Sequence, residues 1–149
     1  MVTNEAQVFQ YFYDHYGVRD SADFWTTPHG GITPLTMIKQ LTTQQVVQVT
    51  VQLEMARARG LVRDITYAAL ISGMQQENQR RASAVAQNRP VYGLMSFTES
   101  EYFNYVTSNL EAELTQDLGE NQLEALISAN VRAAKVQINH AVYDGVVAP

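Results

Sequence analysis

The stretch that decides the fold is Phe9-Gln-Tyr-Phe-Tyr-Asp-His-Tyr-Gly17, followed by an acidic turn that leads to Phe24-Trp25. Its aromatic side chains fall on two neighbouring stripes at helical spacing, namely Phe9, Phe12 and Tyr16, and Tyr11 and His15. Gly17 suits the left-handed position that follows the end of a helix. We therefore predict an aromatic helix that ends at Tyr16. Phe9, Phe12 and Trp25 would lock it onto the next helix.

Signals on either side of this stretch predict further helices. Asn4 with Gln7 predicts the start of the first helix. Thr33-Pro34 is typical of an N-cap with proline at the first helical position, and Gly60 closes a long segment that would be the central helix. The apolar residues between Val47 and Leu53 alternate with polar ones, which also fits a strand. We favour a helix because both flanks are helical and no turn pair follows.

The second half of the chain carries the clearest local signal. Thr98 and Glu101 form a capping box, with Phe97 and Tyr102 at the two positions of a hydrophobic staple. The helix that follows ends at Gly119, and a shorter helix comes next. Before the capping box, Thr66 predicts the start of another helix, whose apolar stripe is Tyr67, Leu70, Ile71, Met74, Ala82 and Val85.

The tail has a different pattern. Val136, Ile138, His140 and Val142 alternate with other residues, which predicts a short strand over 134–144. A lone strand needs a partner, so we expect it to complete a groove, to form a homodimer, or to lead into a further domain. The predicted fold is a single all-α domain over residues 1–149, with about five helices around a long central one and this short C-terminal strand.

Composition excludes several classes of function. The chain has 149 residues, a formal net charge of −5 and no cysteine, so it forms no disulfide and has no thiol nucleophile. Its Lys and Arg residues are scattered, which argues against a nucleic-acid partner. No run approaches the roughly 20 apolar residues of a membrane span. The N-terminus resembles no signal peptide, so we expect a cytoplasmic protein, or an extracytoplasmic one if a leader has been removed.

Few residues fit catalysis or metal binding. The three histidines lie far apart in the sequence, so we expect no metal or other cofactor. Glu77 precedes Arg80 and Arg81 at helical spacing. A structural ion-pair network explains this cluster better than acid–base chemistry. If the chain is an enzyme, its candidate catalytic residues are Glu77, Arg80, Arg81, Tyr92 and His15.

The tyrosines predict a binding cleft, because each buries an apolar ring and keeps a polar tip. Such a cleft suits unstructured peptide or an apolar small molecule. Its candidate residues are Tyr11, His15, Tyr16, Tyr67, Tyr92, Tyr102 and Tyr105.

A set of short motifs resembles one known family. They are the aromatic helix with Tyr16-Gly17-Val18, Asp20-Ser21, Phe24-Trp25, Gly30-Gly31, Thr33-Pro34-Leu35, Val51-Gln52, Gly60-Leu61, Ile65 with Tyr67, Glu77-Asn78, Arg80-Arg81, Val91-Tyr92-Gly93, Phe97, Tyr102, Tyr105 and Ser108-Asn109. In order and spacing they resemble the helical (SurA-N-like) chaperone portion of bacterial SurA/PrsA-type peptidyl-prolyl isomerase foldases, over about residues 6 to 118. The resemblance implies a domain that cradles non-native polypeptide. Family members continue into a parvulin isomerase domain. The sequence up to Pro149 does not contain that domain, so the resemblance does not imply isomerase activity.

The expected function is therefore non-catalytic, chaperone-like binding of unfolded polypeptide or a peptide-like ligand. An alternative is a small stand-alone enzyme of the isomerase or cyclase type, built on the chaperone fold for a biosynthetic pathway. A third interpretation is an assembly module that uses the unpaired strand.

Overall fold

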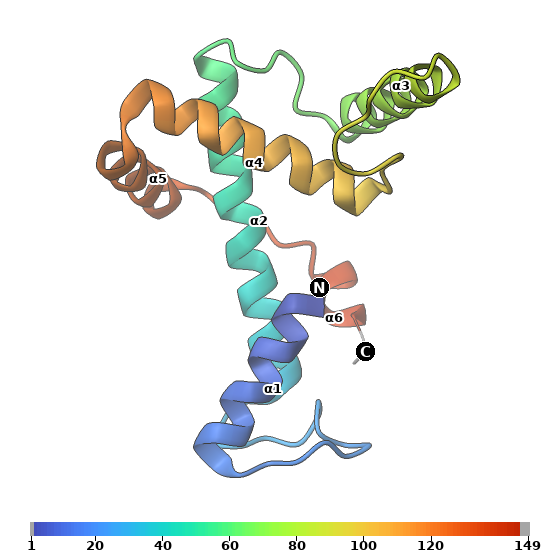
Figure 1. Cartoon of the computed structure of the whole chain (residues 1–149). Coiled ribbons are helices and arrows are strands. Elements are labelled where there is room, and N and C mark those ends of the chain that lie inside the picture. The colour runs from blue at the N-terminus through green and yellow to red at the C-terminus, as the bar shows by residue number, and fades with distance from the viewer. Residues whose placement is uncertain (1, 147–149) are drawn as a thin grey trace. The chain divides into compact units, whose positions relative to one another are not determined.

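The computed structural model describes residues 2–146, with side chains from residue 4 onward (Figure 1). The described residues contain six helices and no sheet, so the all-α prediction is confirmed. In chain order the helices are α1 (Val2–Tyr16), α2 (Pro34–Ala58), α3 (Tyr67–Ala86), α4 (Glu99–Leu118), α5 (Glu120–Ala133) and α6 (His140–Gly145).

The contacts within the chain group into two units. Unit 1 comprises the described residues 2–48 and 133–146, and unit 2 comprises residues 49–132. The boundary falls inside α2, so this long helix contributes residues to both units.

Unit 1 is built on aromatic packing. Phe12 and Phe24 are buried together with Val8 and Ile38. The rings of Phe12 and Phe24 meet edge to face, with their centroids 6.1 Å apart. Gly17 ends α1 in the left-handed conformation, at φ +63°. The aromatic stretch of the sequence therefore forms the core that joins α1 to the first half of α2.

The predicted start of the first helix was wrong. The helix is already formed at Val2, and Asn4 lies within its first turns. The Asn4 side chain is only 2% exposed. Its Nδ2 donates to Gln45 Oε1 at 2.8 Å, and Gln45 Nε2 donates to Asn4 Oδ1 at 2.9 Å. Asn4 therefore joins α1 to α2 rather than capping α1.

The long helix forms as predicted. Thr33 Oγ1 accepts a hydrogen bond from the Thr36 amide at 3.1 Å, as an N-cap does. The segment from Val47 to Leu53 is helical despite its alternating pattern. Gly60 adopts φ +75° just after the helix.

Unit 2 has an aliphatic core where the second half of α2 meets α4 and α5. The buried residues are Met55, Ala56, Leu110, Leu114 and Leu123. The Thr98–Glu101 capping box forms, and Phe97 packs against Tyr102 with 5.7 Å between ring centroids. These two local predictions are confirmed.

The predicted C-terminal strand over 134–144 is not formed. Residues 134–139 have no regular structure, and α6 follows. The Asn139 side chain accepts from the Val142 amide at 3.4 Å and so caps α6. Tyr143 lies under the Lys39 ammonium group, 5.2 Å from its ring centroid. The segment is therefore not a strand in the described residues, and the homodimer stays a prediction.

Candidate functional site

An apolar pocket of about 360 Å³ lies within unit 2. Its walls come from the end of α2, the 62–66 segment, the first turn of α3 and the first half of α4. The apolar side chains that line it are Leu53, Val62, Ile65, Leu70, Phe103 and Val106. Asp64, Thr66 and Thr107 add polar groups, and two tyrosines, Tyr67 and Tyr102, complete the lining.

The start of α3 places one side of this pocket. Thr66 caps α3 by accepting from the Ala69 amide at 3.2 Å. Asp64 Oδ1 accepts from the Thr66 amide at 2.8 Å, and this hydrogen bond lowers the pKa of the Asp64 carboxyl. Asp64 therefore stays ionised at neutral pH and marks the polar edge of the pocket.

Tyr67 is the most exposed aromatic residue of the pocket, with 65% of its surface accessible. Its hydroxyl donates to Glu99 Oε2 at 2.9 Å, and this hydrogen bond raises the pKa of the phenol. The bond joins the first residue of α3 to the first residue of α4. It holds the ring at the edge of the pocket.

Tyr102 approaches α3 closely because residue 73 is glycine. A Cβ atom at Gly73 would lie 2.7 Å from the Tyr102 hydroxyl oxygen. The ring is half-buried, and burial raises the pKa of its phenol. The absence of a side chain at Gly73 therefore allows the Tyr102 hydroxyl to lie this close to α3.

The other end of α3 holds the 87–98 loop through a buried arginine. Arg81 is 5% exposed, and its Nη1 donates to the carbonyl oxygens of Tyr92, at 3.0 Å, and Leu94. Its Nε donates to Glu77 Oε1 at 2.8 Å. Since two loop carbonyls accept from one guanidinium, the loop is fixed to α3.

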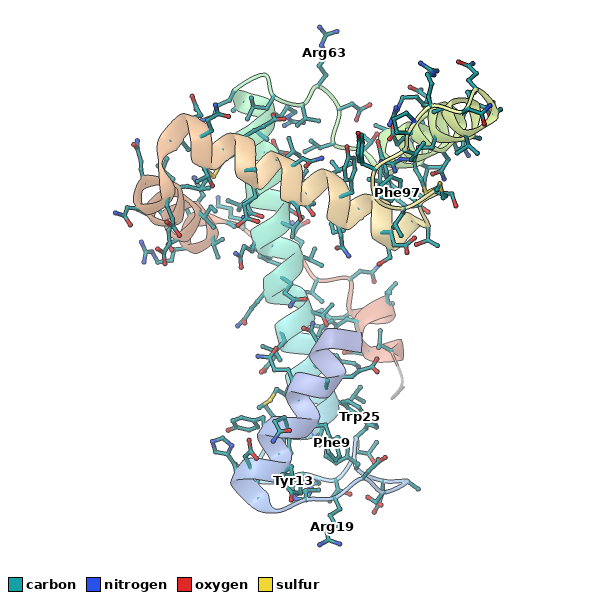
Figure 2. The ribbon with its side chains drawn as sticks, in the orientation of Figure 1. Phe9, Tyr13, Arg19, Trp25, Arg63 and Phe97 are labelled. Carbon is teal, nitrogen blue, oxygen red and sulfur yellow. The ribbon has the colours of Figure 1, made fainter. Side chains whose placement is uncertain are left out.

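A second contact strengthens this attachment. Asn78 Nδ2 donates to the Phe97 carbonyl at 2.9 Å, and the Phe97 amide donates to Asn78 Oδ1 at 2.7 Å. The Arg81 guanidinium also stacks over the Phe97 ring, 4.5 Å from its centroid. Figure 2 shows Phe97 on the loop that leads into α4. We call Arg81, Asn78 and their loop partners the polar clamp.

The electrostatics of Glu77 fit a clamp rather than acid–base chemistry. Arg80 donates to both carboxylate oxygens of Glu77, at 2.7 and 2.6 Å. The hydrogen bonds from Arg80, with a smaller contribution from Arg81, lower the Glu77 pKa to about 2. A carboxyl group that exchanges protons near neutral pH needs a raised pKa.

The other predicted site residues of unit 2 lie near the clamp. Tyr92 is 84% exposed on the loop, although its carbonyl accepts from Arg81. Tyr105 packs against Phe97, with 5.0 Å between ring centroids, and does not line the pocket. Of the four tyrosines predicted in this unit, the pocket brings together Tyr67 and Tyr102.

The three predicted site residues of unit 1 form a cluster of their own. Tyr11 and His15 stack with 4.2 Å between ring centroids, and His15 Nδ1 donates to the Tyr11 carbonyl at 2.8 Å. The Tyr16 hydroxyl lies 2.1 Å from where a Gly30 side chain would begin. His15 thus belongs to unit 1, whereas Glu77, Arg80, Arg81 and Tyr92 belong to unit 2.

Sequence reasoning missed most of the pocket lining. Asp64 and Phe103 were not singled out, Ile65 entered only through the family resemblance, and Leu53 was assigned only to an alternating apolar pattern. Thr66 was predicted solely as a helix cap. The spacing of Asn78 and Phe97 gives no signal either, because these partners lie 19 residues apart in the chain.

Two further features bear on function. Within residues 2–146, no three His, Asp or Glu side chains are grouped so that they could hold a metal ion. No helix in the described part of the chain is both long enough and apolar enough to cross a membrane.

Compared with protein-family models, curated proteins and solved structures, the chain shows no significant match to any of them. The resemblance to SurA/PrsA-type foldases therefore stays a prediction from its motifs.

Proposed function

We propose that this chain binds apolar segments of non-native polypeptide without covalent chemistry, as the helical chaperone portion of SurA/PrsA-type foldases is expected to do. The observation that carries the proposal is the apolar pocket of unit 2, with Tyr67 and Tyr102 in its lining.

The size and chemistry of the pocket support this function. Its volume of about 360 Å³ is near the small end of the roughly 300–1,000 Å³ common for ligand pockets. That space suits one large apolar side chain or a small apolar molecule. Burial of a Leu or Phe side chain contributes about 1.5–3 kcal/mol. Single contacts of this strength suit weak, exchangeable binding of many sequences.

The polar groups around the pocket support a peptide as the ligand. Thr66, Thr107 and the Tyr67 hydroxyl lie among apolar walls. The Tyr67 and Thr107 hydroxyls donate to Glu99 and to the Phe103 carbonyl, so their oxygens can accept hydrogen bonds from a peptide backbone whose side chain enters the pocket. An apolar small molecule would not use these acceptors.

The first test compares two exposed tyrosines. Tyr67→Ala removes an aromatic wall of the pocket, whereas Tyr13→Ala removes an exposed ring from unit 1. We expect wild type and Tyr13→Ala to suppress aggregation of a denatured client equally. Tyr67→Ala should do so less well, and it should bind uncharged apolar peptides severalfold more weakly. Equal activity of all three proteins, or no peptide binding at high micromolar concentration, would contradict the proposal.

Gly73→Ala tests the pocket without removing any wall. The new Cβ must displace the Tyr102 ring, because it would lie 2.7 Å from the hydroxyl oxygen. Replacing a helical glycine by alanine also stabilises the helix by about 0.5–1 kcal/mol. We therefore expect a thermal midpoint close to that of wild type, together with weaker peptide binding.

The matched control for this substitution is Ser72→Ala, at the preceding, exposed position of α3. It should leave peptide binding unchanged. If Gly73→Ala also binds like wild type, the pocket is not the binding site.

A further inference from the structure

A second surface of unit 2 has a different chemistry from the pocket. At the end of α3 lies a hollow of about 380 Å³ lined by Arg80, Ala84, Arg89 and Pro90. We call it the arginine hollow. Two guanidinium groups border it, and the small apolar residues Ala84 and Pro90 complete its lining.

The charge of this region is opposite to that of the whole chain. Arg80 and Arg81 pair with the carboxylate of Glu77, and a third arginine, Arg89, lines the hollow together with Arg80. The local balance is therefore three positive charges against one negative, in a chain whose net charge is −5. Arg81 is buried in the clamp, whereas 63% of the Arg80 side chain is exposed. Arg80 and Arg89 thus present positive charge to solvent.

The backbone that carries Arg89 is fixed by the way α3 ends. Asn88 adopts the left-handed conformation, at φ +53°. The Arg89 amide donates to the Ala84 carbonyl at 2.8 Å, and the Asn88 amide donates to the Val85 carbonyl at 3.0 Å. This long closing bond is that of a Schellman motif. Arg89 therefore leaves the helix in a set direction.

Next to the hollow, the clamped loop exposes large apolar side chains. Tyr92 is 84% exposed, Met95 64% and Leu94 45%. Tyr92 follows Pro90 by two residues, so their Cα atoms lie at most about 7 Å apart. Arg81 and Asn78 hold the loop backbone in place. A loop ordered in advance loses little freedom on binding.

This composition is typical of a protein interface. Tyr and Arg are enriched among the residues that contribute most to binding, and Met is enriched at interfaces. We propose that the arginine hollow and the exposed loop residues Tyr92, Leu94 and Met95 form a docking surface for an acidic polypeptide segment of another protein. A carboxylate of that segment lies between Arg80 and Arg89, and a neighbouring large apolar side chain packs on Tyr92. This surface does not rest on the proposed function of the pocket.

Labelled short peptides test the proposal by fluorescence polarisation. The first peptide combines glutamate with leucine and phenylalanine. In the second, glutamine replaces every glutamate, and in the third lysine does. We expect the glutamate peptide to bind best and to weaken as salt is raised, because exposed charge pairs are screened. Equal binding of the glutamate and lysine peptides would overturn the proposal.

Two variants locate the binding surface. Arg89→Gln removes one border of the hollow, and loss of one exposed ion pair weakens binding by up to about fivefold. Tyr92→Ser removes the apolar contact and should also weaken binding. Arg63→Gln is the matched control, since Arg63 is an exposed arginine of unit 2 that does not line the hollow (Figure 2). Unfolding curves verify that each variant is folded.

The remaining outcomes separate this proposal from others. Tyr67→Ala should keep the preference for the glutamate peptide over the glutamine and lysine peptides, because Tyr67 lines the pocket and not the hollow. If Tyr67→Ala loses that preference and Arg89→Gln keeps it, the docking surface is wrong, whatever the pocket does. Tighter binding of a single-stranded oligonucleotide, or a dimer that Arg89→Gln abolishes, would also replace the proposed partner.

Discussion

Unit 1 packs aromatic rings around Phe12, whereas unit 2 packs aliphatic side chains around Leu114. In unit 1, the ring of Phe12 contacts the rings of Phe24, Tyr16 and His29. In unit 2, the buried cluster draws on α2, α4 and α5 and includes no residue of α3. The core of unit 2 therefore leaves one helix of its unit, α3, outside its buried cluster.

That difference shows how unit 2 keeps an apolar pocket. Only Arg81 and Ala84 are buried on α3. The polar clamp at its C-terminal end and the Tyr67–Glu99 bond at its start attach the helix. Directional hydrogen bonds can hold a helix whose apolar stripe is only partly covered. The uncovered part of that stripe is then free to line a binding site.

We expect the largest loss in the free energy of unfolding when a large side chain is removed from either core. Phe12→Ala should lower the free energy of unfolding by about 3–5 kcal/mol, and Leu114→Ala by about 2–5 kcal/mol, because each leaves a cavity. Urea unfolding is followed by the fluorescence of Trp25, which packs against the unit 1 core, and by circular dichroism. A loss below about 1 kcal/mol for Phe12→Ala would contradict the aromatic core.

We expect a smaller loss in the free energy of unfolding when Arg81 is replaced, and a still smaller one for its neighbour Arg80. Arg81→Met leaves the Tyr92 and Leu94 carbonyls without their donor, and we expect a loss of about 2–4 kcal/mol in the free energy of unfolding. Arg80→Met removes an exposed partner and should cost about 1 kcal/mol or less. Hydrogen exchange of residues 92–97 should rise in Arg81→Met alone. Equal losses in both variants would mean that the loop is not held by Arg81.

The smallest effect depends on pH. The Glu77 pKa is lowered from 4.5 to about 2 in the folded protein, so the unfolded chain binds the proton more readily. Its contribution to stability is present above pH 4.5 and disappears as the pH falls towards 2. We expect this contribution to be about 1–2 kcal/mol, because water screens the exposed Arg80.

The measurement for this prediction is the unfolding free energy of wild type and Glu77→Gln between pH 2 and 5. The difference between the two proteins should shrink as the pH falls, and other carboxyl groups cancel in that difference. A constant difference would contradict the lowered pKa. Loss of a catalytic turnover in a fully stable Glu77→Gln would instead favour the enzyme interpretation.

Local signals predicted most of the helices. The Thr98–Glu101 capping box and Thr33-Pro34 involve partners within a few residues of each other, so the sequence alone contains the whole interaction. Helical flanks decided the Val47–Leu53 segment correctly. In contrast, the prediction that Asn4 starts the first helix is wrong. Its hydrogen-bond partner, Gln45, lies 41 residues away, and no local pattern indicates that contact.

The candidate site was less predictable for the same reason. The stripe of α3 was expected to continue through Ala82 and Val85, yet the buried residues are Arg81 and Ala84. Arg81 is buried because loop carbonyls 11 and 13 residues later accept from it. The alternation that predicted a strand at 134–144 lacks a partner strand in the described residues, and Asn139 starts a helix there instead.

The hydrogen-bonded pair of buried Asn4 and exposed Gln45 also disfavours alternative alignments of α1 along α2. Its two hydrogen bonds form only when these two residues face each other. If α1 slid by one turn along α2, apolar side chains would still find apolar neighbours, but the buried Asn4 amide would lose its partner Gln45, at a cost of about 1–3 kcal/mol. Apolar contacts alone are compatible with many alignments of α1 along α2. This pair therefore favours one alignment over other compact arrangements, which would have nearly equal free energies if the aromatic core alone decided.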